Sequence, residues 1–254
     1  MEAKKAGVKI RHFPWRSKAS WAEKENGAGE LTRRLVTILE PTSAASEAYR
    51  SLRTNLLYAV VDDPPKVIVL TSPGPGEGKS TTCANLGVVL AQAAKSVLLL
   101  DCDFRKPVIH EFFELRNLQG MMNIMMGERN LQEVWQEPLE GLKVVPVGPI
   151  PPNPSEVLGS RRFLRFLDGV RNEFDYVLID ASPVGLVSDP AILATQGDAV
   201  LLVLDAETTR KGALRESVRS LQAVGANILG IVMNNVDVPR GQYYYYGEAN
   251  TYQG

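Results

Sequence analysis

A glycine-rich loop at residues 72–81 constrains the fold of this chain more than any other segment. Its sequence, Ser-Pro-Gly-Pro-Gly-Glu-Gly-Lys-Ser-Thr, follows a Val/Ile/Leu run at 66–71 and precedes a helical stretch at 80–94. In such a strand–loop–helix unit, backbone N–H groups close around an anion and the helix N-terminus adds partial positive charge. The strict pattern G-x-x-x-x-G-K-S/T would place a glycine at Pro73. With this one departure, the loop predicts a phosphate-binding site.

The residue types in this loop indicate a nucleoside triphosphate with Mg²⁺. The amine of Lys79 is expected to reach the β- and γ-phosphates, and the hydroxyl of Ser80 is expected to ligate Mg²⁺. ATP and Mg²⁺ are therefore the predicted cofactors. The residues expected to line the nucleotide site within the loop are Gly74, Gly76, Glu77, Gly78, Lys79, Ser80 and Thr81.

Short apolar runs alternate with helical stretches through most of the chain. The runs are continuous, which is typical of strands buried on both faces of a parallel sheet. We therefore predict an α/β fold of the P-loop NTPase-like type: a doubly wound, mostly parallel sheet with helices on both faces. The expected strands are 66–71, 96–101, 142–147, 175–180, 199–205 and 228–234, and the expected helices are 43–59, 80–94, 160–172, 188–196 and 210–224. The proline-rich segment 149–154 is expected to be an extended loop.

Composition limits the remaining possibilities. A chain of 254 residues suits one α/β domain with appended segments, and a net charge of −1 gives no overall field that would attract nucleic acid. Cys83 and Cys102 lie within apolar elements without metal-type spacing, so they are interpreted as reduced core thiols. No apolar run approaches 18 residues, and the N-terminus lacks the apolar centre of a signal peptide.

Three parts of the chain differ in composition. Residues 1–40 are predicted to be a flexible basic arm, 41–237 the P-loop domain, and 238–254 a flexible tyrosine-rich tail. The arm mixes basic and aromatic residues, so it would suit either an anionic membrane surface or a purely solubilising role. The tail carries four consecutive tyrosines, which cannot share one face of a helix or strand, so they are not expected to pack in the core.

Three aspartates follow predicted strands at the edge that carries the phosphate loop. Asp101 and Asp103 come at the end of the run 96–101, and Asp180 ends the run 175–180. In a parallel sheet, ligands bind at the carboxyl ends of the strands. Crowded carboxylates repel one another, and Mg²⁺ together with Lys79 would supply the missing positive charge. The combination predicts Mg²⁺–nucleotide chemistry.

These motifs resemble the Walker A, A′ and B boxes of the bacterial tyrosine kinases, the cytoplasmic kinases of capsule and exopolysaccharide assembly. The A′ box is written here as Leu100-Asp101-Cys-Asp103-Phe-Arg105, and the B box as Leu-Ile-Asp180-Ala-Ser-Pro183. The resemblance runs from about Pro41 to the C-terminus. It also includes the segments Glu47-Ala-Tyr-Arg50-Ser-Leu-Arg53, Pro-Pro-Asn-Pro-Ser155-Glu and Val187-Ser-Asp189, together with the terminal tyrosines.

The resemblance implies an ATP-dependent protein-tyrosine autokinase that regulates capsule or exopolysaccharide synthesis and export. The γ-phosphoryl group would pass, between subunits, to the tail tyrosines Tyr243, Tyr244, Tyr245, Tyr246 and Tyr252. A simpler interpretation of these tyrosines is a low-complexity tail.

Each site residue then has an expected role. Lys79 would neutralise phosphate charge, and Mg²⁺ would be held by Ser80, Asp103 and Asp180. Asp101 would accept the proton of the phenol, although the roles of Asp101 and Asp103 are interchangeable at this stage. Arg105 would either stabilise charge in the transition state or pair with a local carboxylate. By resemblance, Asn234 would contact adenine.

The resemblance also implies partners. Glu47, Arg50 and Arg53 would lie at the subunit interface of a ring-forming homo-oligomer, although Glu47 and Arg50 alone would also suit a local ion pair. Phosphorylated tails would repel one another and disperse the ring. Further implied partners are a transmembrane activator of the polysaccharide co-polymerase type and protein substrates of sugar-nucleotide metabolism. The expected location is the cytoplasm, with recruitment to the inner face of the plasma membrane.

Two other functions share the predicted fold. The first is a positioning-type ATPase of chromosomes or septa, which would use water as its nucleophile. Such proteins carry a lysine early in the phosphate loop, where this chain has Gly74. The second is a scaffold of the polysaccharide machinery in which the nucleotide controls assembly alone.

Overall fold

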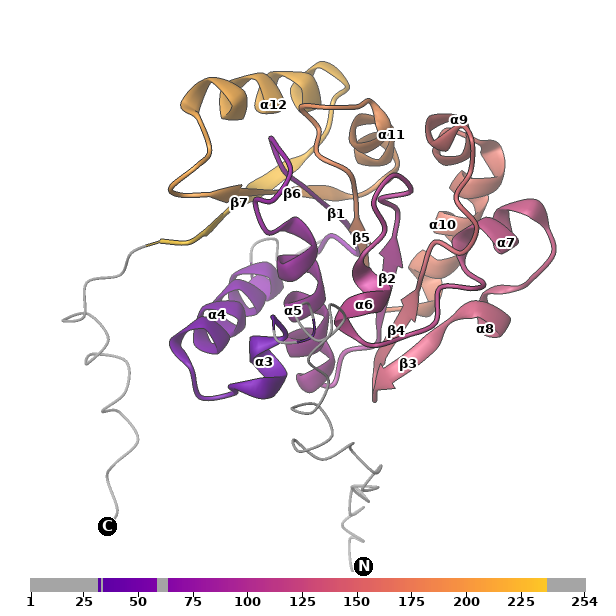
Figure 1. Cartoon of the computed structure of the whole chain (residues 1–254), viewed down its shortest axis with the longest axis horizontal. Coiled ribbons are helices and arrows are strands. Elements are labelled where there is room, and N and C mark those ends of the chain that lie inside the picture. The colour runs from indigo at the N-terminus through magenta and orange to yellow at the C-terminus, as the bar shows by residue number, and fades with distance from the viewer. Residues whose placement is uncertain (1–31, 33, 59–63, 237–254) are drawn as a thin grey trace, which may run out of the picture.

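The computed structural model describes residues 32, 34–58 and 64–236 (Figure 1). These residues form a seven-stranded sheet in the order β3-β4-β2-β5-β1-β6-β7. Neighbouring strands are parallel except for the antiparallel pair of β3 and β4. The strands are β1 Val67–Thr71, β2 Val97–Asp101, β3 Gln136–Leu139, β4 Leu142–Val145, β5 Tyr176–Asp180, β6 Ala199–Asp205 and β7 Ile228–Asn234.

Helices cover both faces of the sheet, which confirms the predicted doubly wound α/β architecture (Figure 1). On one face the core contains residues of α5 and its neighbours, and on the other it contains residues of α7 to α12. The helices are α3 Val36–Leu39, α4 Ala44–Tyr58, α5 Lys79–Gln92, α6 Ile109–Phe112, α7 Met121–Met126, α8 Leu131–Val134, α9 Pro154–Leu158, α10 Arg161–Glu173, α11 Asp189–Gln196 and α12 Lys211–Ala223.

The continuous apolar runs form the central strands, which are buried on both faces as predicted. Every residue of β1, β2, β5 and β6 is buried, so these strands have helices on both sides and no polar face. The sequence analysis missed β3, whose sequence is Gln-Glu-Pro-Leu. This strand lies at the sheet edge, where one side of the backbone needs no partner and Pro138 is tolerated.

The N-terminal boundary differs from the prediction. The sequence analysis assigned all of residues 1–40 to a flexible arm, but Leu35 is only 1% exposed and packs in the core beside α5. The hydroxyl of Thr37 donates a 2.8 Å hydrogen bond to the Asn85 side chain of α5. The packed domain therefore begins before residue 40. The short apolar segment 35–39 packs against α5, and the local sequence of this segment does not predict that contact.

Other expectations concern the cysteines, the membrane and the two ends of the chain. Cys83 and Cys102 are both buried and unpaired, as expected of core thiols. Within the ranges that the structure describes, no helix has the length and apolar character needed to cross a bilayer. Residues 1–31 and the tail from residue 237 onward lie outside those ranges, and so do all five predicted acceptor tyrosines.

Candidate active site

The phosphate loop connects the end of β1 to α5 at the carboxyl edge of the sheet. Gly76 and Gly78 have φ values of 81° and 91°, a left-handed conformation that glycine adopts without strain. Gly78 has a second constraint, since a Cβ there would lie 2.1 Å from Nδ2 of Asn234. These two glycines let the backbone turn into α5, which begins at Lys79, so that the first N–H groups of the helix face the same edge.

Lys79 extends from the first turn of α5 to the carboxylate of Asp103, just after β2, and to that of Asp180, at the end of the neighbouring β5. Its Nζ lies 2.9 Å from Oδ2 of Asp103 and 3.4 Å from Oδ1 of Asp180. Burial lowers the pKa of Lys79, but the negative charges of Asp180 and Asp103 outweigh that effect and raise the pKa above its ordinary value. Lys79 is therefore a permanent cation at the point where the sequence predicts phosphate.

Ser80 and Asp180 form a pair that fits Mg²⁺. The hydroxyl of Ser80 donates a 2.6 Å hydrogen bond to Oδ2 of Asp180, which is fully buried. A hydroxyl and a carboxylate are oxygen donors of the kind that Mg²⁺ prefers. Across residues 32, 34–58 and 64–236, no three His, Cys, Asp or Glu side chains lie close enough together to hold a metal ion. The remaining ligands would therefore be water and phosphate oxygens, as is usual for Mg²⁺.

Asp101 is held rigidly by backbone groups. One of its oxygens accepts a hydrogen bond from the N–H of Asp103 at 3.2 Å. The other accepts from the N–H groups of Val108 and Ile109 at 3.1 and 3.0 Å. The side chain is fully buried, and burial and then the charge of Asp180 raise its pKa well above the ordinary value. Asp101 thus stabilises the conformation of the loop after β2, and both of its carboxylate oxygens already accept backbone hydrogen bonds.

Asp103, unlike Asp101, contacts Lys79 at the end of the phosphate loop. In addition to its contact with Lys79, it accepts a 2.8 Å hydrogen bond from the hydroxyl of Ser182 and a 3.1 Å hydrogen bond from the N–H of Lys106. It is 4% exposed. Sequence reasoning did not single out Ser182, although its position two residues after Asp180 in the B box was an available signal. The structure therefore brings Lys79, Ser80, Asp103 and Asp180 together as predicted, with Asp101 directly behind them.

A second polar cluster supports the other side of the phosphate loop. Asn234, at the end of β7, donates a 2.9 Å hydrogen bond to the backbone oxygen of Glu77. The hydroxyl of Thr209 donates a 2.9 Å hydrogen bond to the Glu77 carboxylate. The same hydroxyl accepts a hydrogen bond from the backbone N–H of Asp205 at the end of β6, and the N–H of Thr209 donates one to the backbone oxygen of Asp205. Burial raises the pKa of Glu77. Sequence reasoning missed Thr209 and Asp205, because neither belongs to a recognised motif.

Arg105 pairs with a carboxylate, which was one of the two alternatives left open above. Its Nε lies 3.0 Å from Oδ2 of Asp189, the first residue of α11. The other oxygen of Asp189 accepts a short hydrogen bond from the hydroxyl of Ser155 at the start of α9. Asp189 is fully buried, whereas the side chain of Arg105 is 46% exposed. Its guanidinium therefore has one edge fixed and the other free to meet a ligand.

The three residues expected at a subunit interface lie on α4. Arg50 and Glu47 form an exposed ion pair at 2.9 Å, which is the local alternative considered above. Arg53 instead donates a 3.1 Å hydrogen bond to the backbone oxygen of Val89 on α5. Its Nε is buried and has no hydrogen-bond partner among the described residues. The pair of Glu47 and Arg50 remains accessible to another molecule.

Known proteins are similar to this chain in sequence and in fold. A family model described as an AAA domain matches residues 65–229. The chain is 36% identical over 233 residues to the tyrosine-protein kinase YwqD of Bacillus subtilis, which covers 91% of this chain and 98% of that relative. The chain belongs to the bacterial tyrosine kinase family. It is also 38% identical over 226 residues to the putative tyrosine-protein kinase EpsB of Ralstonia solanacearum, but it covers only 30% of that longer protein.

Solved structures separate this family from its more distant relatives. The chimerical protein CapA2B2 superimposes with a TM-score of 0.78 at 35% identity, over 81% of this chain and 91% of that one. The septum site-determining protein MinD of Pyrococcus horikoshii reaches a TM-score of 0.57 at 22% identity. MinD therefore shares the fold alone, and the tyrosine kinase interpretation is favoured over the positioning-type ATPase.

Proposed function

We propose that this protein is an ATP-dependent tyrosine autokinase that transfers the γ-phosphoryl group to tyrosines of the 238–254 tail and thereby regulates capsule or exopolysaccharide synthesis and export. The observation that carries this proposal is the position of Lys79, which lies between Asp103 and Asp180 at the mouth of the phosphate loop. The pair of Ser80 and Asp180 beside it fits Mg²⁺. The family to which the chain belongs supplies the acceptor class.

The residues of the site act mainly by positioning and by neutralising charge, as phosphoryl transfer requires. Lys79 would turn from the carboxylates to pair with the β- and γ-phosphates, and the N–H groups around Gly76 and Gly78 would cradle them. Ser80 and Asp180 would hold Mg²⁺, which would supply positive charge beside the phosphates. Asn234, which lies against Gly78, would border the nucleotide. Its contact with adenine is part of the proposal.

The proton of the acceptor phenol also needs a destination. A free tyrosine has a pKa of about 10, so its hydroxyl carries a proton at pH 7. Of the two candidates, Asp103 is the better acceptor, because Asp101 already accepts three backbone N–H groups and is fully buried. Oδ2 of Asp103 would become free once Lys79 turned to the phosphates, while Oδ1 would keep its hydrogen bonds from Ser182 and Lys106. We assign proton acceptance to Asp103 and a positioning role to Asp101.

Incubation with Mg²⁺ and ATP, followed by mass spectrometry of the tail, tests the proposed function. We expect phosphate on one or more of the tail tyrosines, Tyr243–Tyr246 and Tyr252. Release of free phosphate without modification of the protein would instead support the positioning-type ATPase. Bound, unreacted nucleotide would support the scaffold. A Tyr→Phe variant of all five positions is the matched control, because it keeps the nucleotide site and removes every acceptor in the tail.

The proposal includes a ring of subunits in which the tail of each subunit reaches the active site of its neighbour. The exposed Glu47–Arg50 pair would lie at the interface between subunits. Each phosphotyrosine adds about −1.5 to −2 charges, so extensive phosphorylation is expected to disperse the ring. Light scattering checks this expectation by comparing the mass of the unphosphorylated Lys79→Met protein with that of the phosphorylated wild type. We expect a larger mass for the variant, and equal masses would refute the cycle.

The remaining partners and the location rest on family membership. We propose that a transmembrane activator of the polysaccharide co-polymerase type recruits this protein to the inner face of the plasma membrane from the cytoplasm. We further propose that enzymes of sugar-nucleotide metabolism are protein substrates. Deletion of residues 1–31 would show whether the basic arm contributes to recruitment, because the variant would then remain in the soluble fraction of cells that contain the activator.

A further inference from the structure

The two edges of the sheet differ in how well they resist pairing with another strand. At one edge, β3 is four residues long and contains Glu137 and Pro138, and a short strand with a charge and a proline discourages such pairing. At the other edge, β7 is seven residues long, and its sequence Ile-Leu-Gly-Ile-Val-Met-Asn contains no charged residue and no proline. Within the part of the chain that the structure describes, β7 pairs with β6 alone, so its outer side is open (Figure 1).

The second half of β7 offers regular backbone along that open side. The register with β6 shifts between the pairs Val200–Ile228 and Leu201–Gly230 and is regular beyond them. At the end of β7, the backbone oxygen of Asn234 points toward β6, because it accepts a hydrogen bond from the N–H of Ala206. Backbone groups alternate in direction along a strand, so those of Ile231 and Met233 point away from β6. These two residues therefore present N–H and C=O groups that a further strand would satisfy.

Exposed apolar side chains accompany these backbone groups. Val232 packs with the core on the α5 side of the sheet, so Ile231 and Met233 point toward the opposite face. Ile231 is 49% exposed and Met233 is 56% exposed, and Val236, just beyond the strand, is 50% exposed. A long edge strand with exposed apolar residues is a site for β-strand addition.

The sequence that continues from this edge has the features of a partner strand. The segment 238–241, Val-Pro-Arg-Gly, has proline at its second position and glycine at its fourth, which is typical of a type I turn. Tyr243–Tyr246 follow at once, and tyrosine is enriched in strands. A turn at 238–241 would bring the tyrosine run back beside β7 in the antiparallel direction. A segment tethered so closely has an effective concentration in the millimolar range, which favours it over a second copy of the chain.

The tyrosine run also suits the side chains of the β7 edge. Alternate residues of a strand share a face, so two of the four tyrosines would lie on the face of Ile231 and Met233. Pairs of an aromatic and an aliphatic side chain on adjacent strands stabilise a sheet. The hydroxyl of each ring would still reach water at the edge of the sheet.

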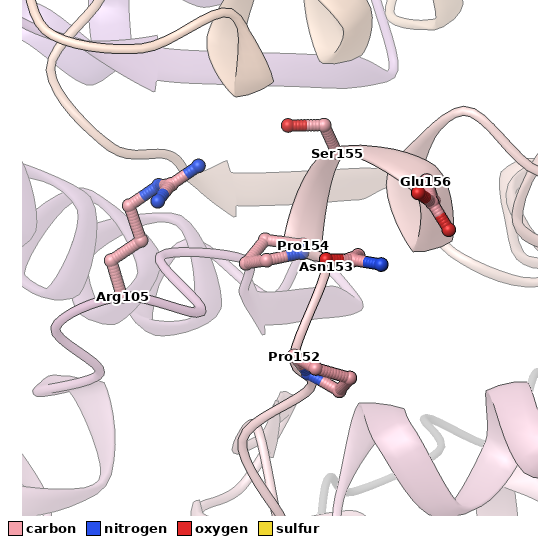
Figure 2. A pocket seen from close by; sticks show the side chains of 6 residues that line it. All are labelled: Arg105, Pro152, Asn153, Pro154, Ser155 and Glu156. Carbon is pink, nitrogen blue, oxygen red and sulfur yellow. The ribbon is translucent and has the colours of Figure 1, made fainter.

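The cavity beside the active site suits a tyrosine less well. Its volume is about 290 Å³, and it is lined by Arg105 and residues 152–156 (Figure 2). Arg105 is already paired with Asp189, Pro154 is buried, and Glu156 contributes a carboxylate to the wall. The cavity therefore offers a ring little to pack against, whereas β7 offers exposed aliphatic side chains together with open backbone.

We propose that the outer edge of β7 binds residues 242–247 of the same chain as an added antiparallel strand, after a turn at 238–241. The interaction requires no phosphoryl transfer, so it goes beyond the proposed function and is independent of it. It gives the tail a bound state on its own domain. The tail must leave this state before its tyrosines can enter the active site of another subunit.

Amide hydrogen exchange, resolved by NMR on the full chain in its dephosphorylated form without nucleotide, tests the proposal. The comparison is between the wild type and a variant in which Tyr243–Tyr246 are all replaced by serine. When the tail is bound, the N–H groups of Ile231 and Met233 donate to it. We expect these two amides to exchange at least about tenfold more slowly in the wild type than in the variant. All four substitutions lie outside the seven strands, so the sheet itself is unchanged.

Two further variants distinguish strand pairing from a general attraction between apolar groups. The double variant Tyr244→Pro, Tyr245→Pro keeps two tyrosines but removes two successive N–H groups, one of which belongs to the ladder in either register. It is expected to exchange as fast as the serine variant at Ile231 and Met233. Tyr252→Ser is the matched control, because it removes a tyrosine outside the bound segment. Its exchange is expected to stay within about twofold of the wild type.

Three results would overturn the proposal. Equal exchange in the wild type and the serine variant would show that the tyrosine run does not cover β7. Slow exchange that survives the two prolines would show contact without strand pairing. Slow exchange that is lost on about tenfold dilution would assign the edge to a second copy, since binding within one chain does not depend on concentration. Failure of the proposed function would appear separately, as an unmodified tail after incubation with Mg²⁺ and ATP.

Discussion

Replacing Lys79 with methionine is expected to reduce the rate of tail phosphorylation by at least about 10²–10³-fold. Lys79 is the one cation that contacts both Asp103 and Asp180 among the described residues, and it occupies the position from which it reaches the phosphates. Methionine keeps much of the length of the side chain but removes the charge. The initial rate of phosphotyrosine formation, measured by quantitative mass spectrometry with Mg²⁺ and ATP, checks this. Lys106→Met is the matched control, since Lys106 is exposed and lies nearby.

The same substitution has an expected effect on stability, which separates lost chemistry from lost folding. Without Lys79, the buried carboxylates have no cation, which is expected to cost about 3–5 kcal/mol near pH 8. Burial already raises the pKa of Asp101 and of Asp180, and Lys79 opposes both shifts. In the variant these pKa values rise further, so the folded state takes up protons at a pH where the unfolded state remains ionised.

The stability of the Lys79→Met protein is therefore expected to recover as the pH falls from about 8 toward 5, more steeply than that of the wild type. Thermal unfolding across this range provides the measurement. A variant that is inactive yet regains wild-type stability at low pH has lost the cation rather than the fold. A phosphorylation rate within about tenfold of wild type at pH 8 would contradict the role assigned to Lys79.

The sequence predicts the frame of the site because a parallel sheet brings the carboxyl ends of its strands to one edge. Asp101 and Asp180 end strands that are direct neighbours, and their Cα atoms are paired in the register of β2 and β5. Their location at one edge of the sheet follows from two apolar runs and the topology rule, whereas their direct pairing depends on the strand order. The same logic places Lys79 opposite them, at the start of the helix that follows β1.

What the sequence does not predict is how loops fold back onto this frame. The occupation of Asp101 by the N–H groups of Val108 and Ile109 depends on the path of residues 102–109, which no periodic pattern describes. The Glu77–Thr209 hydrogen bond joins residues 132 positions apart in the chain. Single polar contacts of this kind leave no signal in one sequence, because each partner is an ordinary surface-type residue when read by itself.

Such contacts are the basis on which we propose one of two nearby carboxylates, Asp103, as the proton acceptor. The sequence analysis named Asp101 as the proton acceptor and left an exchange with Asp103 open, since both follow the same strand. The hydrogen bonds distinguish them. Asp101 accepts three backbone N–H groups, whereas Asp103 accepts one, from Lys106, and otherwise contacts the side chains of Lys79 and Ser182. Substitution of each aspartate by asparagine tests this difference, because we expect Asp103→Asn to lower the phosphorylation rate and Asp101→Asn to lower the stability.

Asp103→Asn is expected to lower the phosphorylation rate by about 10²–10⁴-fold while leaving the fold intact. The amide oxygen still accepts from Ser182 and from the N–H of Lys106, so the local hydrogen bonds survive. The amide cannot accept the proton of the phenol. The rate is measured per folded molecule, with the melting temperature of each preparation as the control.

Asp101→Asn is expected to act chiefly on stability. Both Asp101 oxygens accept backbone N–H groups, so an amide NH₂ in either place faces a donor and leaves at least one buried N–H group without an acceptor. An unsatisfied buried group costs about 1–3 kcal/mol, which outweighs the relief of repulsion from Asp180 if the loop at 102–109 cannot rearrange. Should Asp101→Asn unfold at the wild-type temperature yet lose more activity than Asp103→Asn, proton acceptance belongs to Asp101. The N–H groups of Val108 and Ile109 would then have to release its carboxylate when tyrosine arrives.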